Sequence, residues 1–287
     1  MYKQPITHTN RTAFVIAVDC SASMGGSTQI NSLVLSRDKA VALIGNLLID
    51  ELIERATRNH KVRDYYDIAV IGYGNSSVRS LLPEVLGDGF VSVEYLAKFM
   101  PPYTTIFLDQ IRPDNVVTNA PFTIHPWLTP IAKGNTPMYE ALFSVRELVA
   151  EWCSRPENRH SFPPIIFNIT DGGTNDADSE AITSLAHSIT DIATSDGNVL
   201  LINIHLSTQC EFTRSLLFPS NSSFSTEDRY CRMLFEMSST LPQCMEQLIC
   251  DMIHPDGDGP FRGMAYNASP CDLLTILNIG TESVHRL

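Results

Sequence analysis

The sequence is poor in basic residues and has no long apolar run. It carries 20 Lys and Arg against 32 Asp and Glu, a formal net charge of −12, so it lacks the cationic surface that displaces counterions from nucleic acid. No stretch approaches the roughly 20 apolar residues needed to span a bilayer. The polar first residues also lack the basic start and apolar run of a signal peptide. We therefore expect a cytoplasmic protein with neither a nucleic-acid nor a membrane partner.

Paired metal-binding cysteines are absent as well. The seven cysteines are scattered and form no CxxC pair, which argues against structural zinc and favours a reducing compartment. Hydrophobic residues nevertheless make up 44% of the chain and charged residues 18%, which is the balance of a folded protein rather than a disordered one.

Short apolar runs alternate with helical patterns along the chain. The apolar runs, typical of strands buried on both faces of a parallel sheet, lie at residues 13–18, 67–73, 165–170 and 198–206. Helical patterns lie between them, at residues 33–52, 138–152 and 182–192. This alternation predicts an α/β fold with a Rossmann-like, open, mostly parallel sheet and helices on both faces.

A proline-rich segment at about 82–135 interrupts the alternation. Eight of the 17 prolines fall between Pro83 and Pro137, and we expect a long irregular insertion with one short helix near residues 92–99. Val78–Leu81 is the candidate for a short edge strand. Loops of this length in a compact domain are usually functional or mobile.

The C-terminal third has weaker patterns. Residues 233–237 predict a last strand, and a helix is expected to start at Pro242. We divide the chain into a domain at residues 10–255 and an extension at residues 256–287, whose apolar side chains we expect to pack back on the domain.

Five oxygen-bearing side chains in three separated stretches have the chemistry of a cation site: Asp19, Ser21, Ser23, Thr136 and Asp171. Carboxylates and hydroxyls are the hard ligands that Mg²⁺ prefers, with Mn²⁺ or Ca²⁺ as alternatives. Asp19 and Asp171 each follow a predicted strand, and open α/β sheets bind ligands beyond the carboxyl ends of their strands. With only two charged ligands, the ion would be left able to accept a carboxylate from another protein.

Each stretch also has a purely structural interpretation. Ser21 and Ser23 are able to cap the following helix, Thr136 stands where an N-cap precedes a proline, and Asp171 opens a glycine-rich turn. Cys20, inside the first stretch, is interpreted as a small buried filler. The occurrence of all three stretches in order, each at a strand end or a helix start, favours the metal site.

Other chemical motifs are set aside. The SxxK sequence that contains Arg37 lacks the companion motifs of a penicillin-binding site, so we interpret it as a solvated helix face. His205, within an apolar strand, is interpreted as a satisfied core or rim residue. Without a His or Lys placed as a base beside the ion, and with Cys20 as the one doubtful exception, we expect no enzymatic activity.

The motif that contains these five residues resembles the complete metal-ion-dependent adhesion site (MIDAS) of the von Willebrand factor A (VWA) domain. The resemblance rests on Asp19-x-Ser21-x-Ser23, Thr136 and Thr170-Asp171-Gly172, and covers about residues 10–250. It implies that the two serines and the threonine ligate the metal directly and that the two aspartates act directly or through water. It also implies one short antiparallel edge strand in the sheet.

The sequence around Thr136 and Asp171 is similar to that of intracellular bacterial TerY-like VWA proteins, which are associated with tellurite resistance. That resemblance implies a stress-response or signalling role with a protein kinase or a PP2C-type phosphatase as partner. We expect a non-enzymatic protein-interaction module in which a partner Asp or Glu completes the Mg²⁺ shell. The alternatives are an adaptor for a AAA+ ATPase of the chelatase/MoxR-like kind and, in another class, a metal-dependent phosphoester hydrolase.

Overall fold

A central sheet of eight strands organises the computed structural model, which describes residues 1–30, 32–111, 116–206, 215–222, 224–255 and 258–285. The strands are β1 (Thr12–Asp19), β6 (Tyr66–Gly74), β7 (Ser77–Ser80), β8 (Val91–Ser92), β11 (Ile165–Thr170), β12 (Leu200–Leu206), β13 (Leu216–Leu217) and β14 (Met264–Ala268). Their order is β13-β14-β12-β11-β1-β6-β7, and β8 also pairs with β6. All four predicted apolar strands are therefore present and adjacent.

The sheet is mostly parallel, with antiparallel strands at its two edges. Five central strands run parallel to one another: β6, β1, β11, β12 and β14. At one edge, β7 and β8 are antiparallel to β6, and at the other edge β13 is antiparallel to β14. The predicted fold class is confirmed, and the edge-strand candidate near Val78 is β7. The chain leaves β1 for β6 on one side and returns to β11 on the other, so a topological switch point lies between β1 and β11.

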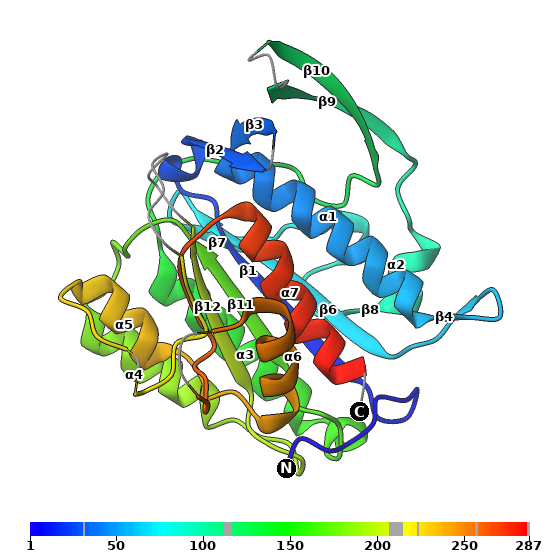
Figure 1. The fold of residues 1–287 in the computed structure, drawn as a ribbon. Helices are drawn as coiled ribbons and strands as arrows, with labels where there is room; N and C mark the ends of the chain where they lie inside the picture. Colours follow the sequence, from blue (N-terminus) through cyan, green and yellow to red (C-terminus); the bar gives the residue numbers. More distant parts are fainter. Residues whose placement is uncertain (31, 112–115, 207–214, 223, 256–257, 286–287) are drawn as a thin grey trace.

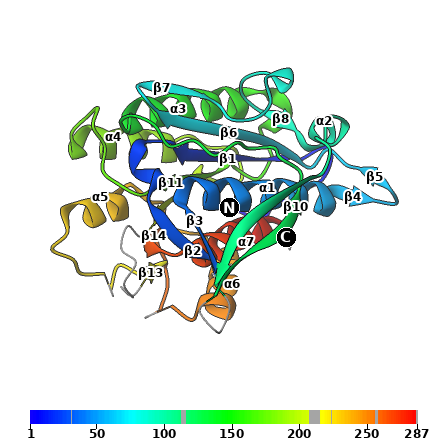
Figure 2. The same cartoon turned by 90° about the horizontal axis from the view of Figure 1, so that it is seen from above.

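Helices cover both faces of this sheet (Figures 1 and 2). On one face lie α1 (Arg37–Ala56), α2 (Val93–Lys98), α6 (Gln243–Ile253) and α7 (Pro270–His285). On the other lie α3 (Met138–Ser154), α4 (Ser179–Thr190) and α5 (Arg229–Met237). β1 serves both layers because successive side chains of a strand point to opposite faces: Phe14 and Ile16 join one buried cluster, and Val15 and Ala17 join the other.

The proline-rich insertion is not one long irregular excursion, so that prediction is wrong for residues 104–111 and 117–124. It forms a hairpin of β9 (Thr104–Ile111) and β10 (Val117–Ile124), which belongs to a second sheet with order β10-β9-β3-β2. Figure 1 shows the hairpin rising from the body of the molecule above β2 (Ser27–Ile30) and β3 (Leu33–Ser36). The expected helix near residues 92–99 is α2. Prolines are tolerated here because β10, which contains Pro121, is an edge strand.

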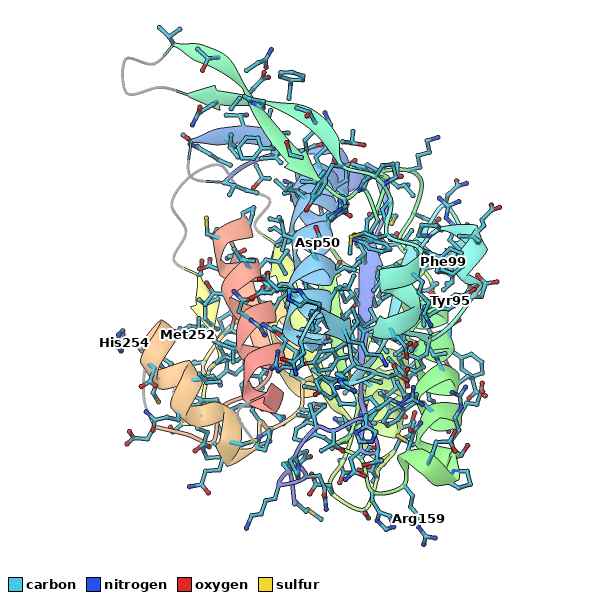
Figure 3. The ribbon with its side chains drawn as sticks, turned by 90° about the vertical axis from the view of Figure 1, so that its right-hand side faces the viewer. Asp50, Tyr95, Phe99, Arg159, Met252 and His254 are labelled. Carbon is cyan, nitrogen blue, oxygen red and sulfur yellow. The ribbon has the colours of Figure 1, made fainter. Side chains whose placement is uncertain are left out.

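Asp50 of α1 anchors the base of this hairpin. The carboxylate accepts hydrogen bonds from Trp127 Nε1 (2.8 Å) and pairs with His125 Nδ1 (2.9 Å). Both partners directly follow β10, and Figure 3 shows Asp50 on α1 close beneath the hairpin. The hairpin is thus fixed to α1 by polar contacts as well as by the small apolar cluster that contains Leu43 and Leu108.

Two further predictions are corrected. The helical pattern at 33–52 begins as a strand, because Leu33 and Leu35 are buried alternately in β3 and α1 starts only at Arg37. The strand predicted at 233–237 lies in α5, where the Asp228 carboxylate caps the helix by accepting hydrogen bonds from two backbone amides. A short apolar run fits a buried strand or a buried helix equally well, so periodicity alone did not separate them.

β14 and α7, the last two elements of the chain, complete the central sheet and cover part of one of its faces. β14 lies between β12 and β13, and α7 packs against α1 and α6 with Leu273, Ile276 and Leu277 buried. The expected helix after Pro242 is α6. The remaining elements are the short hairpin β4 (Thr57–Arg58) and β5 (Lys61–Val62) and the 3-10 turns η1 (Ala22–Gly25), η2 (Glu84–Leu86) and η3 (Pro156–Asn158). None of the described helices is both long and apolar enough to cross a bilayer.

Candidate metal centre

The three predicted stretches meet at the carboxyl ends of β1 and β11. Asp19 is the last residue of β1 and Asp171 follows β11, its parallel neighbour in the sheet. The loop that carries Thr136 is tied to the other two by backbone hydrogen bonds, with Lys133 N donating to Cys20 O (2.7 Å) and Asn175 N to Thr136 O (3.2 Å). Main-chain contacts therefore hold the loops together without help from the five side chains.

Three of the five side-chain oxygens form a continuous chain. Ser21 Oγ lies 2.9 Å from Ser23 Oγ, and Ser23 Oγ donates to Asp171 Oδ1 over 2.6 Å. Ligands at about 2.1 Å from an octahedral Mg²⁺ are about 3.0 Å from their neighbours in the shell. The serine oxygens are thus spaced as adjacent ligands of such an ion are, and the Ser23–Asp171 contact is slightly tighter. Ser23 is exposed while Ser21 and Asp171 are buried, so the cluster has one side open to solvent.

Asp19 forms the floor of the cluster. Its side chain is buried, Oδ1 accepts from Ser21 N (2.8 Å), and Oδ2 accepts from Thr170 Oγ1 (2.8 Å). Burial raises the pKa of the Asp19 carboxyl, and the hydrogen bonds from Ser21 and Thr170 oppose that rise. A buried carboxylate has lost the water that hydrates its charge, so a cation held close to it stabilises the ionised form.

The helix-cap interpretations are wrong. The Ser21 side chain makes no capping hydrogen bond to η1, and α3 is preceded by Pro137, also without a side-chain cap. The Thr136 hydroxyl makes no hydrogen bond to any residue that the structure describes, although Thr136 is buried. The amides at the start of α3 are instead capped by Asp176, which accepts from Tyr139 N (3.1 Å) and Glu140 N (3.0 Å). The cap that the sequence assigned to Thr136 is thus supplied by Asp176.

Arg37 is the residue of this site that the sequence did not reveal. We predicted a solvated helix face, but its guanidinium is buried and Nε donates to Asp171 Oδ2 over 2.8 Å. Nη2 donates to Ser23 O over 2.8 Å. Asp171 thus gives Oδ2 to Arg37 and keeps Oδ1 on the side of Ser23. Gly26 leaves room for the guanidinium, because a Cβ there would lie 2.3 Å from Arg37 Nη2. The sequence alone does not reveal this contact, because it forms only when the loop is folded.

Two ionisable side chains close to the cluster, Cys20 and His205, have pKa values far from neutral. Burial raises the pKa of the Cys20 thiol to about 12, which agrees with its interpretation as a buried filler. Burial also lowers the pKa of His205 to about 4, and its Nδ1 accepts from Asn267 N (3.2 Å). The ring stacks on Tyr266 with centroids 4.4 Å apart. His205 is thus the satisfied residue that the sequence predicted.

The donor set suits a hard cation rather than zinc. Among the described residues, no group of three or more His, Cys, Asp or Glu side chains is placed to hold a metal. A cation here would depend on hydroxyl oxygens in addition to the two carboxylates, which is oxygen chemistry of the Mg²⁺ kind. Ser21 and Ser23 place hydroxyl oxygens in a chain with Asp171, whereas the Thr136 hydroxyl makes no hydrogen bond to any of them.

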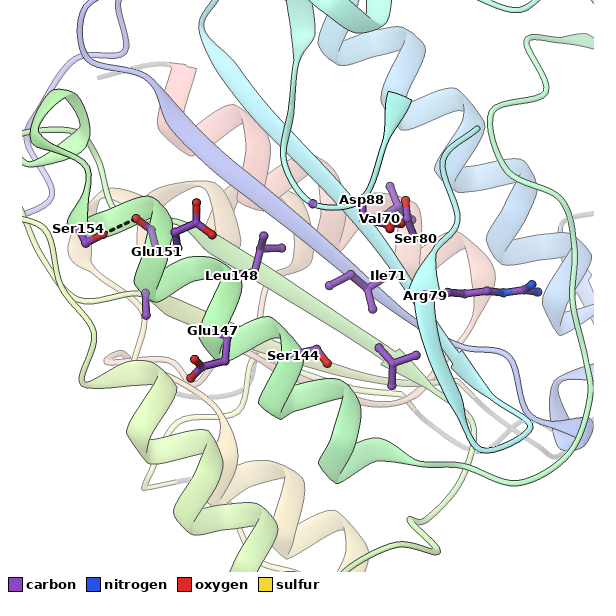
Figure 4. A pocket seen from close by; sticks show the side chains of 13 residues that line it. Val70, Ile71, Arg79, Ser80, Asp88, Ser144, Glu147, Leu148, Glu151 and Ser154 are labelled. Carbon is purple, nitrogen blue, oxygen red and sulfur yellow. Dashed lines mark hydrogen bonds between the residues drawn. The ribbon is translucent and has the colours of Figure 1, made fainter. Parts of the chain in front are cut away.

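A separate hollow of about 770 Å³ opens between the sheet edge and α3 (Figure 4). Asp88, Glu147 and Glu151 contribute its acidic groups, and Ser154 Oγ donates to the Glu151 carbonyl over 2.7 Å. No residue of the three loops lines it. It is therefore distinct from the candidate metal centre.

No protein-family model and no curated protein sequence matches the chain. Among solved structures, it is similar to a von Willebrand factor type A protein from Catenulispora acidiphila, with 15% identity and a TM-score of 0.41 over 69% of this chain and 34% of that one. It is similar to the SpRpn10 VWA domain, with 11% identity and a TM-score of 0.41 over 87% and 99%. Both of these solved structures carry the von Willebrand factor A description.

A third neighbour is proximal thread matrix protein 1 from the mussel byssus. It shares 14% identity at a TM-score of 0.48, over 96% of this chain and 48% of that one. The chain thus spans about a third of the Catenulispora protein and about half of the byssus protein. The fold class rests on the sheet topology itself.

Proposed function

We propose that this protein is a VWA-type interaction module that binds Mg²⁺ through Asp19, Ser21, Ser23, Thr136 and Asp171. The observation that carries the proposal is the convergence of the three loops at the switch point of the sheet, where the side-chain oxygens of Ser21, Ser23 and Asp171 form a continuous chain. The serine oxygens have the spacing of neighbouring ligands, and the Thr136 hydroxyl makes no hydrogen bond to a described residue. Mn²⁺ or Ca²⁺ would suit the same oxygen donors.

The ion would serve to dock a partner protein. Two carboxylates and three hydroxyls leave room in a six-ligand shell, and Mg²⁺ fills such positions with water or an incoming carboxylate. The exposed Ser23 lies at the open side of the cluster. An Asp or Glu of the partner would replace the water there and so couple binding to the metal.

The hairpin β9–β10 would frame this contact. The chain passes from Ser23 directly into β2 at one end of the small sheet, and from β10 through residues 125–135 to Thr136 at the other. Phe107 and Val117 expose 67% and 61% of their surface. Exposed apolar side chains of this kind are enriched in protein interfaces.

A non-enzymatic role is favoured over phosphoester hydrolysis. Cys20, next to Asp19, is a thiol with its pKa raised to about 12. His205, near Asp171, is a buried imidazole with its pKa lowered to about 4 and its Nδ1 engaged. Neither is matched to general-base catalysis near neutral pH. Metal-dependent turnover of a generic phosphoester by the purified protein, lost in Asp171→Ala, would favour the hydrolase instead.

Asp19→Ala tests the proposal directly. We expect this variant to lose Mg²⁺-dependent capture of its partner, because it lacks a proposed ligand. It should keep its far-UV circular dichroism, because removing the desolvation cost of a buried carboxylate offsets part of the loss of its hydrogen bonds from Ser21 N and Thr170 Oγ1. Asp251→Ala, on the exposed side of α6, is the matched control and should capture the partner as the unmodified protein does. Equal capture in Mg²⁺ and in EDTA would contradict the proposal.

The same capture experiment identifies the kind of partner. Bound proteins that appear with Mg²⁺ and disappear with EDTA or with Asp19→Ala are identified by mass spectrometry. A protein kinase or PP2C-type phosphatase would support the signalling role, and a AAA+ ATPase would support the adaptor role.

A further inference from the structure

Arg37 is built into the metal site and not merely near it. Its side chain is 7% exposed and contacts two of the three loops, through Asp171 Oδ2 and Ser23 O, each at 2.8 Å. A third, longer contact joins Nη1 to Ser27 O at 3.5 Å. A buried guanidinium requires such partners, because an unpaired buried charge is costly.

The backbone makes room for this guanidinium. Arg37 N donates to Gly26 O over 2.9 Å, which brings the first residue of α1 against the loop that carries Ser23. A Cβ at Gly26 would lie 2.3 Å from Nη2 and 2.9 Å from Cζ of Arg37. The absence of a side chain at Gly26 therefore creates the space in which the guanidinium lies.

The charge of the site depends on this residue. With both carboxylates ionised, Asp19 and Asp171 contribute −2 and Arg37 contributes +1, so the site carries −1 without a metal. A divalent ion changes the total to +1, and one carboxylate from a partner then brings it to zero. Without Arg37, the metal alone would neutralise the site and an incoming carboxylate would leave it negative.

We propose that Arg37 is a resident cation that weakens metal binding and makes the loaded site demand an anionic ligand. The inference rests on the proposed metal site. Arg37 contacts Asp171 Oδ2 and leaves Oδ1 on the side of the serines, so it acts on the ion through charge and through the orientation of Asp171. It is a positioning residue and not a ligand. Like charges held close together in a partly buried site repel each other strongly.

The first test measures binding of Mn²⁺ alone. Electron paramagnetic resonance detects the Mn²⁺ that remains free in solution. Arg37→Gln removes the charge but keeps a hydrogen-bond donor for Asp171, and we expect it to bind Mn²⁺ at least about ten-fold more tightly than the unmodified protein. Arg37→Lys retains the charge and should bind within about two-fold of the unmodified protein. Arg37→Met is a second neutral variant that should behave as Arg37→Gln does. Circular dichroism identifies which variants are folded.

The second test uses acetate as a carboxylate probe. Displacement of water from the bound Mn²⁺ lowers the proton relaxation rate, so titration with acetate reports its affinity for the loaded site. We expect acetate to bind at least about five-fold more weakly to the Mn²⁺-loaded Arg37→Gln variant than to the loaded Arg37→Lys variant, because the neutral loaded site has less attraction for an anion.

The outcomes separate this inference from the proposed function. If the unmodified protein and Arg37→Gln both fail to bind Mn²⁺, the proposed metal site itself is wrong. If the unmodified protein binds Mn²⁺ but folded Arg37→Gln and Arg37→Lys show equal Mn²⁺ and acetate affinities, the metal site stands and the role of Arg37 is refuted.

Discussion

At the scale of single residues, two buried threonines near the site differ in what their hydroxyls do. Thr170 Oγ1 donates to Asp19 Oδ2 and is 2.8 Å from it. The Thr136 hydroxyl has no such partner among the described residues, although Thr136 is only 6% exposed. One hydroxyl therefore has a side-chain partner in the fold, and the other has none among the described residues.

Valine substitutions at these two positions separate the roles. Thr136→Val should change the free energy of unfolding in EDTA by less than about 0.5 kcal/mol, since no hydrogen bond is lost, yet weaken Mn²⁺ binding. Thr170→Val should cost about 1–3 kcal/mol, because Asp19 loses a buried donor. Urea unfolding in EDTA and Mn²⁺ titration measure the two effects. Unchanged Mn²⁺ affinity in Thr136→Val would show that this hydroxyl is not a ligand.

At the scale of elements, the hairpin β9–β10 presents opposite faces through neighbouring residues. Leu108 is 8% exposed and belongs to the small cluster with Leu43 of α1. Phe107, one position earlier, is 67% exposed. The alternation of a strand thus puts one side chain in the core and the next on the surface.

Serine substitutions at these neighbouring positions test the proposed docking role of the hairpin. Phe107→Ser should leave urea unfolding within about 0.5 kcal/mol of the unmodified protein while weakening metal-dependent partner capture. Leu108→Ser should lose about 2–4 kcal/mol through the emptied core position, which makes it the structural control. Full capture by Phe107→Ser would remove this face of the hairpin from the proposed interface.

At the scale of the whole molecule, the C-terminal residues complete the central sheet. β14 pairs with β12 in parallel and with β13 in antiparallel. α7 closes over the sheet, where a Cβ at Gly280 would come within 2.4 Å of Phe167 Cζ. Arg55 of α1 also donates to Thr281 Oγ1 over 3.0 Å. The boundary at residue 255 remains a prediction from the sequence, and these contacts provide a way to test it.

Removal of residues 256–287 should abolish a cooperative thermal transition. The truncation deletes β14 and α7 and exposes the apolar surface that Leu273 and Ile276 bury, so the remaining sheet would lose its cover on one face. Differential scanning calorimetry of the truncated and full chains makes the comparison. A truncated chain with an intact transition would instead show that residues 1–255 fold alone.

The sequence by itself determined the layered α/β fold and four of its central strands, because short apolar runs and helical periodicity are properties of the local sequence. It also predicted that Asp19 and Asp171 lie at one edge of the sheet, since the carboxyl ends of parallel strands share one edge. Periodicity did not distinguish the α5 run from a strand, and the many prolines between residues 82 and 135 hid the hairpin.

Tertiary structure decided the rest. Only the packed loops show that Arg37 turns inward to Asp171, because its burial depends on the space left by Gly26 and on a carboxylate 134 residues away. Only they show that the Thr136 hydroxyl makes no cap, because Asp176 already occupies the start of α3. Long-range pairing of charges and donors has no periodic signature in the sequence, so the electrostatics of the site became visible only in the fold.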